Sequence, residues 1–252
     1  MARTLGTPMS IRLITIAFSH YCEKARWALD RAGIAYVEDA HLPLFSYLPL
    51  VRAGAKRTAP ALVTGDGPVV VDSTDILHWC DGKGDAEPLF PPGDAAVAEL
   101  EDDFDRRLGP ATRRLAYFHL LGDRRATLDV MGKHGPAWER VVGKAAWRLA
   151  VIAIRRGLRV DAAGAERSRT VIDQTFAVVG ERLADGRRYL GGDRLTAADL
   201  TFASLAAPIV LPPGYADYLP RPDLVPPAFQ AIADHYRRTP AGELVLRAYD
   251  ER

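Results

Sequence analysis

The chain has 252 residues and 48% of them are hydrophobic, which is enough for one large core or two smaller ones, and we expect two domains. Its 33 Lys and Arg residues against 32 Asp and Glu residues give a formal net charge of +1. No strong overall field would therefore attract phosphate backbones or anionic lipid, and we expect neither a nucleic-acid nor a membrane partner.

The cysteines, histidines and apolar runs exclude several other classes. The opening residues, MARTLGTPMSIRLITIAF, contain no apolar core of a secretory signal before the first strand-like run, and no segment has the length needed to span a bilayer. Cys22 and Cys80 are too few for a disulfide framework or a four-ligand zinc site, and the six histidines show no paired helical spacing. We expect a cytoplasmic protein without a metal.

The first third of the chain reads as a small α/β unit. Residues 11–18, IRLITIAF, predict a strand that is buried on both faces, and residues 34–40 predict a second one. Between them lies a helix that Gly33 is well placed to end, which makes a parallel strand-helix-strand unit. Its apolar face is formed by Cys22, Ala25, Leu29 and Ala32.

A hairpin and a short helix complete this unit. Residues 41–58 are hard to assign beyond one short helical turn. Residues 59–73, APALVTGDGPVVVDS, predict two strands joined by a Gly-Asp-Gly turn, and STDILHWCD predicts a helix ending near Gly82. The following residues, 83–94, are dense in Gly, Pro and charge and indicate a linker.

Everything from residue 95 to residue 252 is helical in pattern. Gly109-Pro110 should break or kink one long helix over residues 95–121. Further helices are predicted at 136–158, 165–186, 228–239 and 241–251. The helix at 137–158 is basic and carries tryptophan, which suits a membrane surface, but we favour a central helix with a solvated basic edge.

One helix start in this half is specified by four residues. Thr196 can cap the helix, and Asp199 three positions later can reach back to the Thr196 amide. Leu195 and Leu200 occupy the two positions of a hydrophobic staple. We expect a structural and not a catalytic role for Thr196 and Asp199.

Ser19, at the junction of the first strand and the first helix, has two interpretations. A serine before a helix commonly caps it, because its hydroxyl accepts a hydrogen bond from a free amide of the first turn. The same amides and the helix dipole favour a sulfur anion, to which the Ser19 hydroxyl can donate. Ser19 is thus either a cap or a group that stabilises a thiolate from another molecule.

Four segments in order, FSHYCEKARWAL, TAPAL, VVDSTDI and YLGGDRLTAADL, resemble the soluble glutathione transferases. The resemblance implies a thioredoxin-like α/β domain over residues 1–82 and an all-helical domain over residues 95–252 that carries the second-substrate site. It further implies glutathione as the co-substrate, a homodimer, and Ser19 in the position that contacts the glutathione sulfur. A hydroxyl there suggests conjugation of glutathione to an electrophile.

The resemblance also assigns residues to the rest of glutathione. It places a cis bond at Ala59-Pro60, where the backbone of Ala59 would pair with the cysteinyl part of the tripeptide. Asp72 would face the γ-glutamyl ammonium, and Ser73 with the amides of the next helix would hold its carboxylate. The glycyl carboxylate would bind Lys56 or Arg57.

Two residues depart from the family pattern or leave an alternative open. His20 stands where the family often has proline, and we favour a solvent-exposed loop histidine over one that tunes the sulfur. Cys22 is favoured as a small buried residue, but an exposed, acidic Cys22 would support a glutathione-dependent thiol transferase or reductase. A binding or scaffold protein that lost the reaction is the third possibility.

The second substrate is expected to be an apolar electrophile. It would lie between the loop after the first strand and the first long helix of the second domain. The residues expected to contact it are Phe18, His20, Tyr21, Tyr117, Phe118 and Leu121.

Overall fold

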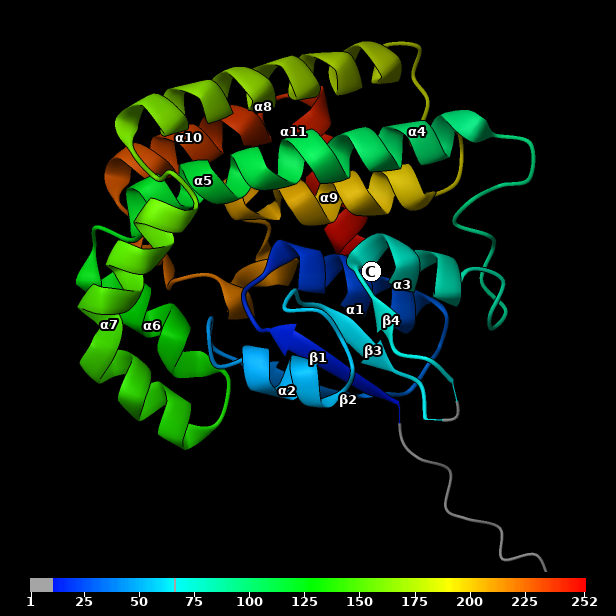
Figure 1. Ribbon diagram of the computed structural model, residues 1–252. Coiled ribbons are helices and arrows are strands. Elements are labelled where there is room, and N and C mark those ends of the chain that lie inside the picture. The colour runs from blue at the N-terminus through cyan, green and yellow to red at the C-terminus, as the bar shows by residue number, and fades with distance from the viewer. Residues whose placement is uncertain (1–10, 66) are drawn as a thin grey trace, which may run out of the picture.

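The computed structural model describes residues 11–65 and 67–252. Residues 1–10, on which the expectation about a leader segment rests, lie outside this range. So does Asp66, the central residue of the Gly-Asp-Gly turn. The remaining chain folds as an α/β part followed by a larger helical part, as the sequence predicts (Figure 1).

The α/β part is built on a four-stranded mixed sheet in the order β2-β1-β3-β4. The parallel pairing of β1 with β2 and the antiparallel hairpin of β3 with β4 confirm the two units predicted above. β1 also pairs antiparallel with β3, with Leu13 opposite Leu62. The strands are β1 (Arg12–Ile16), β2 (Val37–His41), β3 (Ala61–Val63) and β4 (Val70–Val71).

Helices cover both faces of this sheet. Helices α1 (His20–Arg31) and α3 (Ser73–Cys80) lie between the sheet and the helical part, and the short α2 (Tyr47–Arg52) covers the opposite face (Figure 1). Because α1 packs against the sheet, α3 and α9, it is buried over most of its surface, charged residues included. Its N-terminus, which Ser19 precedes, therefore lies inside the molecule and not at its edge.

The predicted break at Gly109-Pro110 is wrong, because the chain stays helical throughout. Helix α4 (Ala95–Asp103) continues through a π-helical turn (Phe104–Leu108) into α5 (Gly109–Leu120). The wider turn accommodates Pro110, whose missing N–H and ring would strain an ordinary α-helical turn. Gly109 is required because a β-carbon there would collide with the Tyr21 hydroxyl, 2.3 Å away.

Helix α9 (Ala197–Val210) is the centre of the helical part, and every one of its residues is buried. The predicted helix start is confirmed, because the Asp199 carboxylate accepts the Thr196 N–H at 2.9 Å and the Thr196 hydroxyl at 2.6 Å. Asp199 also accepts the Leu190 N–H at 2.7 Å. Around α9 pack α4, α5, α8 (Ala162–Leu183), α10 (Pro227–Arg237) and α11 (Pro240–Asp250).

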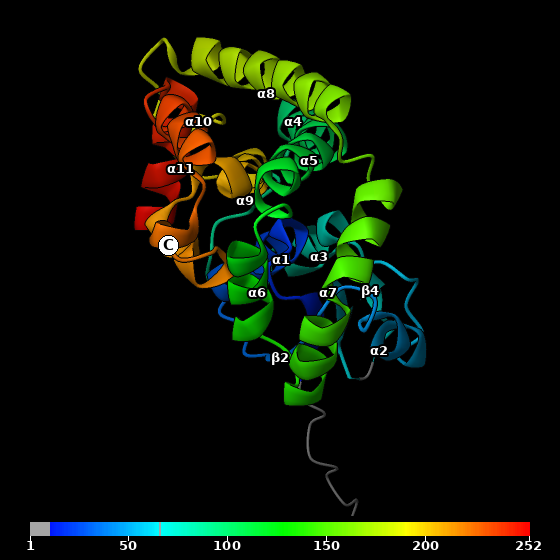
Figure 2. The same ribbon diagram turned by 90° about the vertical axis from the view of Figure 1, so that its left-hand side faces the viewer.

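Helix α7 (Ala137–Gly157) is not the central helix that we expected. It forms a hairpin with α6 (Arg124–Lys133), a helix missed in the sequence, and the two lie beside the main bundle and reach down along the α/β part (Figures 1 and 2). Its accessible side chains are apolar as well as basic, since Trp138 is 60% exposed and Leu149 72% exposed. The packing of the bundle therefore does not explain these side chains.

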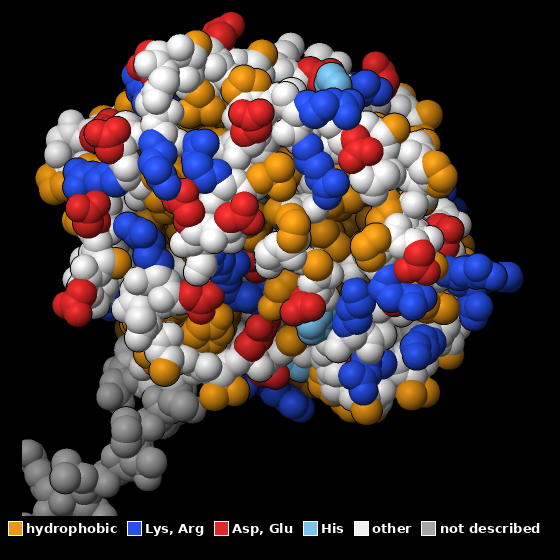
Figure 3. Space-filling model, turned by 180° about the vertical axis from the view of Figure 1, so that it is seen from behind, with side chains coloured by type: hydrophobic (Ala, Val, Ile, Leu, Met, Phe, Trp, Pro, Cys, Tyr) orange, Lys and Arg blue, Asp and Glu red, His pale blue; other side chains and the backbone are white. Residues whose placement is uncertain are grey.

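The surface carries charges of both signs. Figure 3 shows Lys and Arg side chains interspersed with Asp and Glu across the rear face, as the near-zero net charge requires. Within residues 11–65 and 67–252, no helix combines the length and apolar character needed to cross a bilayer.

Candidate functional site

Ser19 ends the turn after β1 and immediately precedes α1. Its backbone N–H donates to the Ile16 carbonyl at 2.8 Å, and its carbonyl accepts the Glu23 N–H at 2.9 Å. The side-chain hydroxyl makes no capping hydrogen bond, so the capping role is not realised among the described residues. The hydroxyl is half-buried and remains available to a ligand placed over the amides of the first turn of α1.

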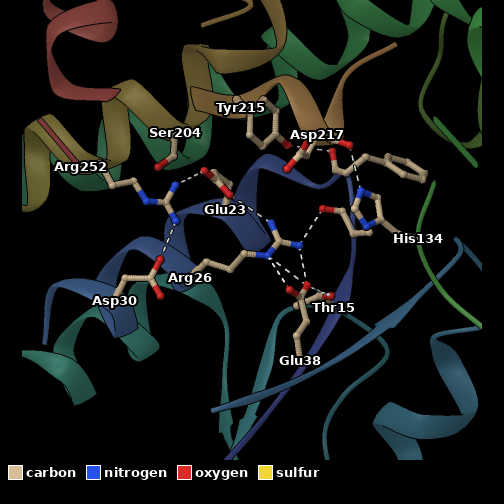
Figure 4. A network of polar contacts seen from close by, with 12 residues as sticks. Thr15, Glu23, Arg26, Asp30, Glu38, His134, Ser204, Tyr215, Asp217 and Arg252 are labelled. Carbon is tan, nitrogen blue, oxygen red and sulfur yellow. Dashed lines mark hydrogen bonds and ion pairs between the residues drawn. The ribbon is translucent and has the colours of Figure 1, made fainter. Parts of the chain in front are cut away.

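Two distant side chains hold the turn that presents Ser19. Arg26 donates to the Ala17 carbonyl at 2.7 Å, and the Tyr215 hydroxyl donates to the Phe18 carbonyl at 3.1 Å. Arg26 is itself paired with Glu38 at 2.7 Å, and Glu38 accepts the Thr15 hydroxyl (Figure 4). Sequence inspection did not identify this support, because nothing local distinguishes Arg26 from a solvated helix residue.

The same polar network ties the end of the chain to α1. One guanidinium N–H group of Arg252 donates a hydrogen bond to Glu23. An N–H group on another nitrogen donates to Asp30 at 2.8 Å (Figure 4). Glu23 is fully buried and is also paired with Arg26 at 3.1 Å. The carboxylate is thus matched by two cations, which a buried charge requires.

His20 is not the exposed loop histidine that we expected. It is the first residue of α1 and is 3% exposed, and its Nε2 lies 3.0 Å from the Gly109 carbonyl. Burial, reinforced by the Arg113 charge, lowers the pKa of His20 to about 3. His20 is therefore neutral at physiological pH and donates to Gly109 across the interface of the two parts.

Cys22 lies on the inner face of α1 and is fully buried, which confirms its predicted packing. Burial raises the pKa of its thiol to about 11, although the Arg26 guanidinium and the Ser19 hydroxyl act in the opposite direction. A buried thiol with a raised pKa is neither accessible nor ionised at neutral pH.

The residue pairs expected to hold glutathione are neighbours in the sheet. The Ala59-Pro60 bond is cis, as expected, and it precedes β3. The Asp72 N–H donates to the Pro60 carbonyl at 3.3 Å, which places the start of α3 beside this bond. We call Ser19, Ala59-Pro60 and Asp72-Ser73, the residues expected to bind glutathione, the polar edge.

Asp72 has the backbone geometry of a constrained residue. Its φ of 92° lies in a region that residues other than glycine rarely adopt. Its carboxylate accepts the Thr74 N–H at 2.9 Å and so caps α3, while the residue as a whole stays exposed. Ser73, the first residue of α3, is buried. One carboxylate oxygen of Asp72 is engaged by the cap, and a cation can approach the other.

A buried lysine connects the polar edge with the helical part. Lys24 is fully buried, and its Nζ donates to Thr74 Oγ1 at 2.9 Å, to Asp105 at 2.7 Å and to Glu101. Helices α1, α3 and α4 and the π-helical turn therefore meet at one ammonium group. Neither Lys24 nor its partners were singled out from the sequence, since a Lys next to Glu23 and close to Arg26 is typical of the solvated side of a helix.

The two cations proposed for the glycyl carboxylate differ in position. Both Lys56 and Arg57 are exposed. Lys56 lines a shallow pocket together with Thr58, β4, Asp72 and Asp75, whereas Arg57 does not line it.

A second, apolar pocket of about 370 Å³ opens on the other side of Ser19. We call it the apolar pocket. Its walls come from the turn after β1, from residues 43–45, from α5, α6 and α7, and from residues 215–220. The volume is at the lower end of the range of small-molecule sites.

Four of the six residues expected at the second substrate line this pocket, namely Phe18, His20, Tyr117 and Leu121. The other two do not. Tyr21 turns its hydroxyl to the Asp105 carbonyl, and Phe118 packs against the hydrophobic core. Half of the remaining lining residues come from α6 and α7, whose placement no local pattern revealed.

No cluster of three or more His, Cys, Asp or Glu side chains with the arrangement of a metal site occurs within residues 11–65 and 67–252. Two charged residues of α1 are committed to ion pairs, Lys24 with Glu101 and Asp105, and Arg26 with Glu38.

Comparisons with solved structures establish the fold. A β-etherase from Sphingobium sp. strain SYK-6 is 18% identical with a TM-score of 0.58, over 96% of this chain and 98% of that one. A glutathione S-transferase from Methylobacillus flagellatus, with glutathione bound, is 16% identical with a TM-score of 0.56, over 96% of each chain. FzlA from C. crescentus is 16% identical with a TM-score of 0.55, over 97% of this chain and 93% of that one.

Family models identify both parts of the chain. No curated protein sequence matches it. The model for the glutathione S-transferase N-terminal domain matches residues 13–88, and the model for the C-terminal domain matches residues 162–238. Together they span more than half of the chain, in the order of the family. The protein therefore belongs to the glutathione S-transferase superfamily.

Proposed function

We propose that this protein is a glutathione transferase that joins the glutathione sulfur to an apolar electrophile. The observation that carries the proposal is the position of Ser19. Its hydroxyl precedes α1 without capping it, and its chain neighbours Phe18 and His20 line the apolar pocket. A thiol held there meets a compound in the pocket.

In the proposed reaction Ser19 donates a hydrogen bond to the thiolate of bound glutathione and is not itself modified. The thiol proton leaves to solvent. The sulfur then attacks the electrophilic carbon with its electron pair, a carbon–sulfur bond forms, and the leaving group departs with the electrons of the broken bond. For an activated double bond or an epoxide, the electrons move to the acceptor, which then takes up a proton.

The polar edge supplies the groups for the rest of the tripeptide. Ala59 offers its backbone to the cysteinyl part, Asp72 offers its second carboxylate oxygen to the γ-glutamyl ammonium, and Ser73 with the first amides of α3 binds the carboxylate. Lys56, which shares a pocket with Asp72, is the better placed of the two cations for the glycyl carboxylate.

The decrease in the pKa of the bound thiol that the reaction requires is moderate. A free thiol has a pKa of about 8.5, and lowering it to about 7 raises the thiolate fraction at neutral pH roughly tenfold or more. One hydroxyl donor together with the partial charge of a helix N-terminus is of the right size for this change.

Ser19→Ala tests the proposal. We expect kcat/KM for 1-chloro-2,4-dinitrobenzene to fall by about tenfold, the factor by which the lowered thiol pKa raises the thiolate fraction, while the Kd of glutathione changes little. Calorimetry measures that Kd, and ultraviolet titration of the bound thiolate should show its pKa rising. Ser204→Ala is the matched control, since the Ser204 hydroxyl donates to Leu200 within α9 and lies outside the proposed site.

Other outcomes would favour the alternatives. Undiminished conjugation by Ser19→Ala would contradict the role of Ser19. Loss of thiol exchange with a mixed disulfide in Cys22→Ala would support a thiol transferase, against which the burial of Cys22 argues. Absence of any glutathione binding by the native protein would point to a scaffold. Membership of the superfamily also supports a cytoplasmic homodimer, which sedimentation would test.

A further inference from the structure

Arg113 is the one guanidinium group that lines the apolar pocket. On α5 it lies three and four residues before Ala116 and Tyr117, and seven before Leu120, so all four side chains share one helical face. All four line the pocket. Arg113 stands at the end of this face nearest to Ser19, because its charge acts on His20 and its guanidinium lies 5.9 Å from the Tyr21 ring.

Arg113 has no counter-ion within residues 11–65 and 67–252. The neighbouring arginines are engaged, since Arg114 donates to the Leu158 carbonyl at 3.1 Å and to Ser168 at 2.9 Å, and Arg107 pairs with Asp103. For Arg113 no hydrogen bond or ion pair occurs in the described part of the chain. No Asp or Glu is among the residues that line the pocket.

The other polar groups near the pocket do not compete with Arg113 for an anion. His20 is held neutral, and Arg26, although close to Tyr218, is already paired with Glu38. The pocket therefore combines apolar walls with a single unpaired guanidinium at one end. A guanidinium with no acidic partner among apolar side chains can form charge-assisted, bidentate hydrogen bonds with the carboxylate of a ligand.

We propose that the second substrate is an anionic amphiphile, an apolar compound with one carboxylate or similar group that Arg113 binds, and an electrophilic carbon near that end. This inference rests on the proposed function and assigns its substrate class. The apolar body would extend along α5 towards α6 and α7. Arg113 would select substrates by charge, and a neutral compound of the same shape would bind more weakly.

The test compares two ligands that differ only in charge, 6-phenylhexanoate and 6-phenylhexanamide. Calorimetric titration of each into the native protein, without glutathione, should show the acid binding roughly tenfold or more tightly, the range of a hydrogen bond to a charged group. Arg113→Gln should remove this preference with the amide affinity changed less than about threefold, and Arg113→Lys should retain part of it. Arg107→Gln, on the solvent side of the same helical stretch, is the matched control and should behave as the native protein does.

Each other result overturns the inference. Equal binding of acid and amide, or a preference that survives in Arg113→Gln, would show that Arg113 does not select the ligand. Binding of neither compound would show that the pocket does not take such ligands. A loss of glutathione affinity in Arg113→Gln with the acid preference unchanged would assign Arg113 to glutathione instead.

Failure of the proposed function gives a different pattern. If Ser19→Ala conjugates as well as the native protein, but the acid preference is present and depends on Arg113, the anion site stands and the conjugation mechanism falls. Because the titration omits glutathione, the two proposals are measured separately.

Discussion

The polar edge and the apolar pocket meet at Ser19, but different parts of the chain build them. The polar edge uses backbone groups at the ends of strands and helices, within segments of a few residues such as Ala59-Pro60 and Asp72-Ser73. The apolar pocket is lined by side chains from residue 18 to residue 220. The polar edge thus consists of several short segments, each of which is formed locally. The apolar pocket exists only after the helical part has packed.

This difference has a functional meaning. The polar edge combines the backbone groups of Ala59 and of the first turn of α3 with the Ser19 and Asp72 side chains, so it depends on few side chains, which suits the binding of one constant tripeptide. A pocket lined by side chains changes with each substitution, which suits the selection of a particular acceptor. Substitutions should therefore separate into those that affect both surfaces through their shared supports and those that affect the pocket alone.

The largest expected effect is on the support of the polar edge. In Lys24→Met, the Glu101 carboxylate loses its buried partner, and Thr74 in the first turn of α3 loses its donor. We expect the free energy of unfolding in urea to fall by about 3–5 kcal/mol, as for other buried pairs broken on one side. Lys144→Met, an exposed lysine on α7, is the control and should change it by less than about 0.5 kcal/mol.

A small change in the free energy of unfolding in Lys24→Met would mean that the contacts of Lys24 with Thr74, Glu101 and Asp105 do not join the two parts of the molecule. Combining it with Glu101→Gln isolates the pair, because the double variant leaves no uncompensated carboxylate at that position. We expect the double variant to recover part of the lost stability.

An intermediate effect is expected from His20, which lies where the two surfaces meet. Its pKa of about 3 in the folded state is below the ordinary value of 6.5, so the unfolded chain binds the proton first as the pH falls. This contribution to stability is therefore complete above pH 6.5 and declines by about 1.4 kcal/mol per pH unit below it, to a loss of roughly 2 kcal/mol at pH 5.

Urea unfolding of the native protein and of His20→Gln at pH 7, 6 and 5 measures this contribution. The glutamine can still donate to the Gly109 carbonyl but does not titrate. The difference between the two proteins should shrink by roughly 2 kcal/mol from pH 7 to pH 5. A constant difference would show that His20 has the same pKa in the folded and in the unfolded protein.

The smallest effect is expected from a substitution that changes the apolar pocket and leaves the polar edge intact. Ala150 lines the apolar pocket, so Ala150→Phe should lower kcat/KM for a bulky acceptor by about tenfold and leave the Kd of glutathione unchanged. Ala145→Phe, on the exposed side of the same helix, is the matched control. Equal effects on glutathione and acceptor would mean that the two surfaces are not independent.

Much of the polar edge was predictable from short segments. The strand before Ser19, the hairpin after Pro60 and the start of α9 at Thr196 each depend on residues a few positions apart, whereas the cis bond at Ala59-Pro60 was implied by the resemblance to the family. Backbone preferences and capping hydrogen bonds act over that range, so the local sequence contains the information. The roles that these residues play towards glutathione remain a prediction.

The predictions that were wrong all depend on distant contacts. His20 looked exposed because its acceptor, Gly109, is 89 residues away. Gly109-Pro110 looked like a break because a π-helical turn depends on how the long helix packs against α1 and α9. Helix α7 looked central, although its neighbours place it at the periphery with Trp138 and Leu149 exposed.

The sequence by itself therefore determined the two-part architecture, the parallel strand-helix-strand unit, the hairpin after it and the start of α9, because each follows from patterns within short segments. Only the tertiary structure decided which charged residues of α1 are buried, that His20 is neutral, and that Arg113 enters an apolar pocket without a partner. Those properties arise because packing removes water from around these side chains. No single segment of the chain specifies which of its side chains will lose contact with water.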